Sequence, residues 1–179
     1  LKQDKDSSDL SLKHSLESLV KENALKGDVV TSLPLNKISA FSYILPNMPA
    51  DEIESALLWK VRQNLSPGIN FDDLSFDYCF SVCTENNKDI YALVFLADKK
   101  ISLEMVKLFK ELSLDLMIIE PKPYAIIECL SLLKKISEEE TVLMLQLGSS
   151  SSSITIISNG HPYLIMPLAV SGNGFTEAL

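Results

Sequence analysis

The sequence predicts an α/β fold in which helices cover a mixed sheet. Segments with the 3.6-residue periodicity of amphipathic helices alternate along the chain with short apolar runs that end at proline, glycine or polar turns. Mean hydropathy is positive and 46% of the 179 residues are hydrophobic, so the chain can bury a core as one domain or as two small subdomains. The predicted element order is α β β α β β α β α β β β α.

One helix and two strands are expected first. The helix is predicted by apolar residues at helical spacing, namely Leu12, Leu16, Leu19 and Val20. Gly27 is expected to end it, because helices favour glycine just beyond their last turn. Residues 28–33 and 37–45 then read as short strands, which Pro34 and Pro46 stop.

A second helix and a hairpin are predicted next. Pro49 fits the first turn of a helix, where its missing N–H group has no intrahelical partner to lose, and helical spacing continues to about residue 65. Residues 74–82 and 90–97 are apolar, β-branched and aromatic runs on either side of a polar turn. They therefore predict a β-hairpin.

A helix, a strand and another helix are expected to follow the hairpin. Ser102 is the expected cap of a helix that ends near Leu112. Residues 114–119 read as a strand stopped by Pro121, and residues 123–136 read as a helix.

The most informative stretch is an apolar strand that begins at Val142 and breaks at Gly148 into five consecutive serines. The chain returns as a second apolar run to Asn159-Gly160, the pair favoured in two-residue hairpin turns. Small residues let the main chain approach a phosphate, and successive N–H groups can bind an anion. The pattern predicts a phosphate-binding hairpin, with a flexible hairpin tip at residues 149–153 as the alternative.

Charge and cysteine content argue against several functional classes. Acidic residues number 24 against 16 basic residues, a formal net charge of −8, which disfavours nucleic acid as a partner. Cys79, Cys83 and Cys129 fit no zinc spacing and are expected to be reduced core thiols. No apolar run approaches the ~20 residues of a membrane span. No histidine lies at motif spacing from Ser32 or Ser171, so we predict neither catalytic residues nor metal ligands.

Five short motifs carry a family resemblance: residues 29–34, 45–53, 77–78, the loop after Gly148, and residues 171–176. In this order and spacing they resemble the type IV pilus assembly protein PilM. That family is similar to the cell-division protein FtsA, which has an actin-like (ribonuclease H-like) ATPase fold with an inserted α/β subdomain. The resemblance covers nearly the whole chain.

The resemblance implies a division into subdomains. Residues 1–35 and 123–179 would belong to the first large actin-like subdomain, and residues 36–122 would form the inserted one. Strands 28–33 and 141–168 would then share one sheet. The resemblance also implies an incomplete chain, because the family's first phosphate hairpin would precede Leu1 and its second actin-like half would follow Leu179.

Carried over by position, the resemblance implies a nucleotide-phosphate site at Gln146, Gly148, Ser149, Ser152 and Gly172. Gln146 stands where the family has an aspartate that holds hydrated magnesium, and a neutral amide does not supply that charge. Two further departures lie nearby, Met166 for an arginine and Ser171 for a glycine. We therefore expect a degenerate site: ATP and magnesium are conceivable ligands of a longer protein, but this chain is expected to bind them poorly and not to be an ATPase.

Two hypotheses about function follow. The first is a cytoplasmic scaffold of a type IV pilus or related secretion system, held at the inner membrane through partners. It would bind the amino-terminal peptide of a PilN-like membrane protein beside other pilus-assembly proteins, with Phe41 and Tyr43 on strand 37–45 as walls of the peptide site. The second is an active actin-like ATPase, such as an FtsA-like protein or a sugar kinase. A GspL-like cytoplasmic domain of type II secretion is a further alternative.

Overall fold

The computed structural model describes residues 3–82, 88–133, 135–137 and 139–177. The chain forms two compact units, one of residues 1–31 and 100–119 and the other of residues 32–99 and 120–179. The subdomain boundaries predicted from the resemblance differ from these and stay a prediction. Within the described ranges, no helix is both long enough and apolar enough to cross a membrane.

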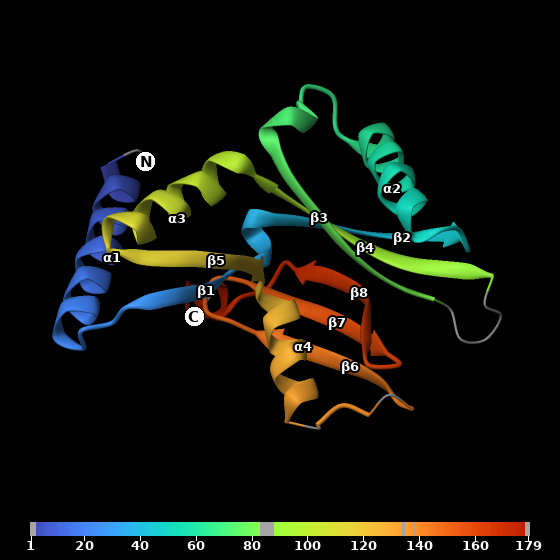
Figure 1. Ribbon diagram of the computed structural model, residues 1–179. Helices are drawn as coiled ribbons and strands as arrows, with labels where there is room; N and C mark the ends of the chain where they lie inside the picture. The colour runs from blue at the N-terminus through green and yellow to red at the C-terminus, as the bar shows by residue number, and fades with distance from the viewer. Residues whose placement is uncertain (1–2, 83–87, 134, 138, 178–179) are drawn as a thin grey trace. The chain divides into compact units, whose positions relative to one another are not determined.

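The first unit is built from two helices and a two-stranded sheet (Figure 1). The helices are α1 (Gln3–Glu22) and α3 (Lys99–Glu111), and the paired strands are β1 (Gly27–Leu33) and β5 (Leu114–Pro121). Phe109, Leu112 and Leu114 are buried at the centre, with side chains of α1 and β1 packed against them. The helix that was predicted to end near Leu112 therefore exists and contributes Phe109 to this core.

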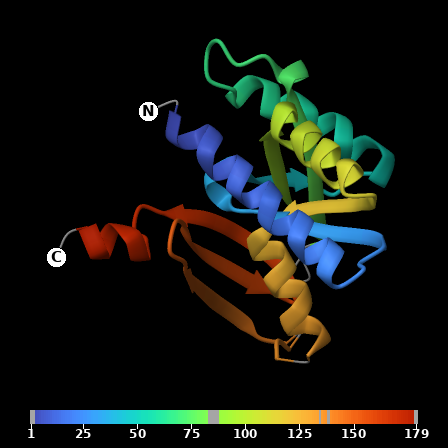
Figure 2. The same ribbon diagram turned by 90° about the vertical axis from the view of Figure 1, so that its left-hand side faces the viewer.

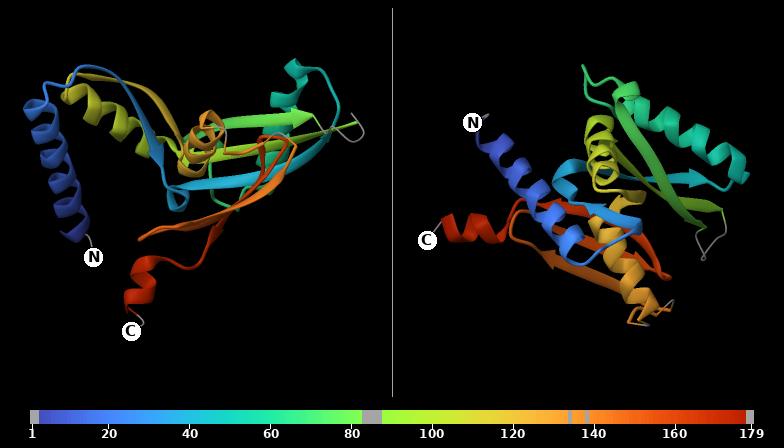
Figure 3. Two further views of the ribbon diagram at one scale, coloured as in Figure 1. Left: turned by 90° about the horizontal axis from the view of Figure 1, so that it is seen from below. Right: turned by 60° about the vertical axis from the view of Figure 1, so that its left-hand side comes forward.

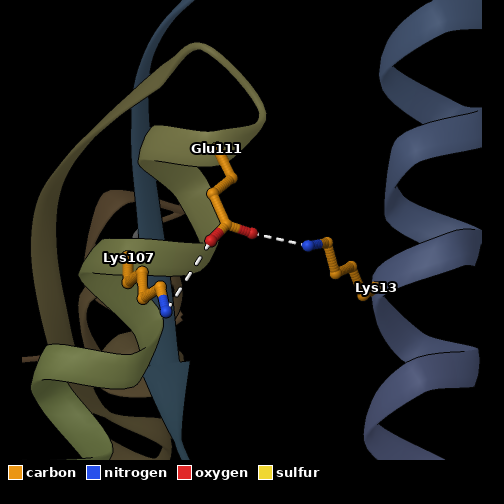
Figure 4. Close-up of polar contacts among 3 residues, drawn as sticks. All are labelled: Lys13, Lys107 and Glu111. Carbon is orange, nitrogen blue, oxygen red and sulfur yellow. Dashed lines mark hydrogen bonds and ion pairs between the residues drawn. The ribbon is translucent and has the colours of Figure 1, made fainter.

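An ion pair links the two helices of this unit on its surface (Figure 4). Lys13 of α1 donates a hydrogen bond to Glu111 of α3, and Lys107 approaches the other carboxylate oxygen at 4.0 Å. Pairing with Lys13 lowers the pKa of the Glu111 carboxyl, and the same pairing raises the pKa of the Lys13 ammonium. Both groups are exposed, so this contact contributes little to stability.

Three helix boundaries differ from the sequence predictions. The helix expected at residues 123–136 is α4 (Lys122–Leu132), which ends four residues earlier than predicted. Helix α1 ends at Glu22 and not at Gly27, because Ala24 takes a left-handed conformation (φ 49°) and the Leu25 N–H donates to the Val20 carbonyl. Gly27 instead opens β1 with φ 104°. Helix α3 begins at Lys99, ahead of the expected cap Ser102, because β4 runs directly into it at Asp98, a residue type favoured before helices.

The second unit contains a three-stranded antiparallel sheet with the order β2-β4-β3. Its strands are β2 (Ile38–Pro46), β3 (Leu74–Val82) and β4 (Asp89–Asp98). The predicted hairpin is confirmed, since β3 and β4 pair in register from Leu74 opposite Asp98 to Val82 opposite Ile90. Helix α2 (Ala50–Asn64) covers one face of the sheet (Figure 3). Short 3-10 turns, η1 (Leu35–Lys37) and η2 (Phe71–Asp73), precede β2 and β3.

Alternation along β4 divides its side chains between two cores. Ile90, Ala92, Val94 and Leu96 pack against the buried face of α2, which consists of Ile53, Leu57 and Val61. Leu93 and Phe95 point to the opposite face, where they pack with Leu35 and with Ile165 of β8. The central strand is therefore covered on both sides, as the fold class requires.

The second unit also contains a three-stranded sheet with the order β6-β7-β8. Its strands are β6 (Thr141–Leu147), β7 (Ser152–Ser158) and β8 (His161–Leu168), which lie side by side in Figure 2; α4 (Lys122–Leu132) precedes them and α5 (Gly172–Glu177) follows. The Asn159-Gly160 turn is confirmed, with φ values of 53° and 74°.

The expectation that strands 28–33 and 141–168 share a sheet is wrong. Strand β1 pairs with β5, whereas β6, β7 and β8 pair only with one another in the described sheets. The loops that join β6 to β7 and β7 to β8 are short. Each strand therefore pairs with its neighbour in sequence, and the three strands form a local antiparallel sheet.

Candidate functional site

The loop after β6 is tightly folded around Gly148. An ideal Cβ at this position would lie 2.4 Å from the Ser151 carbonyl oxygen, so only glycine fits without a shift of the backbone. The Gly148 N–H donates to the Ser152 hydroxyl oxygen at 3.3 Å. The sequence placed both residues in one phosphate loop, and the structure brings them into direct contact.

The start of α5 closes over this loop. The N–H groups of Gly172 and Asn173 donate to the carbonyl oxygens of Gly148 and Ser149, both at 2.9 Å. A Cβ on Gly172 would approach the Ser149 Cα to 3.3 Å, which explains a small residue there. Four of the predicted phosphate-site residues, Gly148, Ser149, Ser152 and Gly172, are thus neighbours, but the N–H groups of Gly148 and Gly172 already donate within the protein.

Gln146 belongs to β6, where it pairs with Ser153 of β7. Its Oε1 atom is buried without a hydrogen-bond partner, and so is the Ser153 hydroxyl. Both side chains line a recess of about 170 Å³, counting the space open to solvent. The other lining residues come from η1, the first turn of α4 and the serine loop: Leu35, Lys122, Pro123, Ser151 and Ser152.

The lining of this recess does not fit magnesium. Magnesium favours carboxylate and phosphate oxygens in octahedral geometry, and none of the described residues that line the recess is acidic. The charged residue among them is Lys122, whose side chain has no acceptor atom that could bind a cation. Across the part of the chain that the structure describes, no group of three histidine, cysteine or acidic side chains is arranged to hold a metal.

Lys122 and Pro123 are site residues that the sequence analysis missed. They stand far from Gln146 in the chain and reach it only because α4 begins beside the hairpin. The available signal was the Pro121-Lys122-Pro123 segment, which ends a strand and starts a helix, a junction where ligand sites of α/β sheets often form.

The Cys79 thiol on β3 is not activated as a nucleophile. Burial, followed by the charge of Asp77, raises the pKa of the Cys79 thiol to about 11, so this half-buried thiol stays protonated at neutral pH. Cys129 is exposed on α4, which corrects the expectation of a core thiol, and Cys83 lies outside the described residues. Burial and then Glu128 raise the pKa of Glu120.

The predicted peptide-site residues Phe41 and Tyr43 lie on β2, which is an edge strand of its sheet. Both are partly buried and pack against the core beneath α2, with ring centroids 6.4 Å apart. The Asn64 amide donates to the Tyr43 hydroxyl at 3.5 Å, and the Lys60 ammonium lies 6.0 Å from the centre of that ring. They therefore hold β2 against the helix, and the free edge itself is formed by main-chain groups.

No protein-family model matches the sequence, and a search of curated proteins finds no significant match. Solved structures do match. A chain of the PilM-PilN type IV pilus biogenesis complex is similar over 94% of this chain, with a TM-score of 0.79 and 22% sequence identity. The fold is PilM-like. This confirms the predicted α/β class and the actin-like fold that the family resemblance implied.

A second similar structure is the cytoplasmic domain of EpsL, an inner membrane component of the type II secretion system of Vibrio cholerae. It has a TM-score of 0.57 and 13% identity over 87% of this chain. The present chain spans about half the length of the matched chains, 50% of the first and 56% of the second. At these identities the likeness establishes the fold alone.

Proposed function

We propose that this chain is a scaffold component of a type IV pilus or related secretion system. In this proposal it holds the extended amino-terminal peptide of a PilN-like membrane protein at the cytoplasmic face of the inner membrane, together with other pilus-assembly proteins. The observation that carries the proposal is the PilM-like fold, since the matched chain comes from a complex of PilM with PilN. The net charge of −8 suits a partner segment rich in lysine or arginine.

The edge of β2 is the proposed docking strand. The Asn47 N–H donates to the Lys88 carbonyl at 2.6 Å, which makes this a hydrogen-bonded pair of the β2–β4 ladder. Such pairs alternate in antiparallel sheets, so Phe41 and Tyr43 also bond to β4 through their main chain. The N–H and C=O groups of Ala40, Ser42 and Ile44 then point to the outer edge, where an extended peptide can pair with them.

Side chains beside this edge would give the peptide site its pockets. Ile44 is 58% exposed, so its side chain can contact a peptide that pairs with this edge. Phe41 and Tyr43 lie on the α2 side of the same strand and fix its conformation from beneath. Substitution of either aromatic residue is therefore proposed to weaken peptide binding by loosening β2.

A proline at residue 42 should weaken peptide binding at least tenfold, about 1.4 kcal/mol, because it removes an outward N–H group and leaves the bonds to β4 in place. Fluorescence polarisation with a labelled PilN-like peptide from the same operon measures this. Ser42→Ala is the matched control, since it keeps the N–H group and should bind as the wild type does. If the wild-type full chain does not bind the peptide, the proposed peptide-binding function is wrong. If Ser42→Pro binds the peptide as tightly as the wild type does, the outer edge of β2 is not the binding site.

The alternative functions differ from this proposal in the secretion system that the protein serves or in having enzymatic activity. The likeness to EpsL is compatible with a GspL-like role in type II secretion. A peptide from the GspL partner, used beside the PilN-like peptide in the same assay, separates these two scaffolds. The remaining alternative, an FtsA-like ATPase or a sugar kinase, requires a functional nucleotide site.

We expect the full chain to bind ATP with magnesium weakly or not at all and to show no turnover, because Gln146 and Lys122 line the recess where a metal-binding carboxylate was expected. Isothermal titration and a phosphate-release assay measure the two quantities, with Gln146→Asp beside the wild type. Tight magnesium-dependent binding by the wild type that the aspartate variant leaves unchanged would contradict this expectation.

A further inference from the structure

We propose that the outer face of α2 binds the same face of a second copy of this chain, with the two helices antiparallel. Four residues form this face, which we call the α2 seam: Glu52, Ser55, Trp59 and Arg62. The seam is a different surface from the β2 edge, and the proposal goes beyond the scaffold function without depending on it.

The α2 seam is exposed along its whole length. All four of its side chains are exposed, and Trp59 is 61% exposed. Successive members stand three, four and three residues apart, the spacing that aligns side chains on one side of a helix and that helices use to pack against each other. Ile53, Leu57 and Val61 occupy the inward side of α2, so the seam is not needed to hold the helix on its sheet.

Trp59 is the residue of the seam that argues for a protein partner. Tryptophan and arginine are enriched among the residues that contribute most to protein–protein binding. The sequence contains one tryptophan, and the fold places it on the surface and not in a core. Covering its large indole ring would remove apolar area from water, which favours association.

The order of residues along the seam is self-complementary in an antiparallel pair. Glu52 and Arg62 stand five residues on either side of Leu57, and Ser55 and Trp59 stand two residues on either side. A two-fold axis at the level of Leu57 therefore places Glu52 of one copy opposite Arg62 of the other. It also places Trp59 opposite Ser55, a small side chain that leaves room for the ring. A parallel pair would instead bring like charges together, which opposes association.

Arg62 is positioned to pair with a carboxylate of the second copy. Its guanidinium lies 5.0 Å from the centre of the Phe71 ring, a contact that restricts the side chain. A guanidinium that stacks on a ring by its flat face can still donate N–H groups sideways to a carboxylate. Because each copy carries a net charge of −8, the copies repel each other in general, and this pairing supplies attraction at the seam.

The size of the seam predicts a weak, reversible dimer. A helix of 15 residues is about 22 Å long and about 10 Å across. Its footprint is therefore smaller than the ~800 Å² per partner that a standard stable interface buries. Association is expected to appear as the protein is concentrated and to disappear on dilution.

Fluorescence and sedimentation equilibrium of the full chain over a range of concentrations test the proposal. Because Trp59 is the one tryptophan in the sequence, its emission should shift to shorter wavelength as the average mass rises toward that of a dimer. Glu52→Arg should weaken association at least about tenfold, because it places two arginines opposite each other. Glu54→Arg makes the same charge reversal at an exposed position of α2 outside the seam and should leave association unchanged.

Mixing two variants gives the sharpest result. Arg62→Glu alone should also weaken association, but an equimolar mixture of Glu52→Arg and Arg62→Glu should associate again, because each arginine then faces a glutamate. A wild type that stays monomeric, a dimer with unchanged Trp59 emission, or a mixture that does not associate would each overturn the proposal. Circular dichroism of each variant shows that it is folded, and peptide binding at the β2 edge is measured separately.

Discussion

Leu57→Ala is expected to lower the free energy of unfolding of the second unit by about 2–5 kcal/mol. Leu57 is completely buried in the middle of α2, where it packs between the helix and the sheet β2-β4-β3. Truncation removes the contacts of three carbon atoms and leaves a cavity between elements that meet on a broad face. Urea denaturation followed by circular dichroism measures the loss.

The matched control is Leu103→Ala, the same substitution in a helix at a side chain that is 67% exposed. It should change the free energy of unfolding by less than about 1 kcal/mol, since little apolar surface returns to water. Equal effects of the two substitutions would show that α2 does not pack on the sheet as described.

Gly148→Ala is expected to destabilise the β6–β7 hairpin by about 1–3 kcal/mol, the range for overpacking. Its Cβ would lie 2.4 Å from the backbone oxygen of Ser151, and the carbonyl of residue 148 also accepts the bond from Gly172. The loop must therefore shift, and α5 loses an anchor. Denaturant unfolding gives the energy, and amide NMR shifts of residues 149–153 and 172–173 show whether the loop has moved.

Gly174→Ala serves as the control for this variant. A Cβ at Gly174 would lie 3.4 Å from the Ser171 hydroxyl, an ordinary contact, and alanine is the better helix former by about 1 kcal/mol. This substitution should be neutral or slightly stabilising. A neutral Gly148→Ala would contradict the close packing of the loop.

Local signals in the sequence predicted most elements correctly. Pro49 and the helical spacing up to residue 65 located α2, and the buried residues Ile53, Leu57 and Val61 are those that the spacing selects. The Asn159-Gly160 pair predicted its turn because both residues tolerate a positive φ. The ends of elements were predicted less accurately. Helix α1 ends before Gly27 because Ala24 adopts the left-handed conformation that glycine usually adopts at helix ends.

Pairing between distant segments could not be read from local signals. The partner of β1 is β5, and neither strand carries a pattern that distinguishes this pairing from one with β6. The recess has the same cause: Lys122 lies beside Gln146 and Ser153 through the placement of α4, which no motif encodes. The sequence did predict Gln146 and Gly148 as features of one hairpin, because strand and loop are contiguous there.

The central claim is that an extended peptide pairs with the outer edge of β2, and amide hydrogen exchange measured by NMR tests it most directly. On addition of the PilN-like peptide, the amides of Ser42 and Ile44 should become protected from exchange, since they point away from β4. The amides of Phe41 and Tyr43, already bonded to β4, should change little. Unchanged hydrogen exchange at the amides of Ser42 and Ile44, or new protection of amides along β3, would contradict the account.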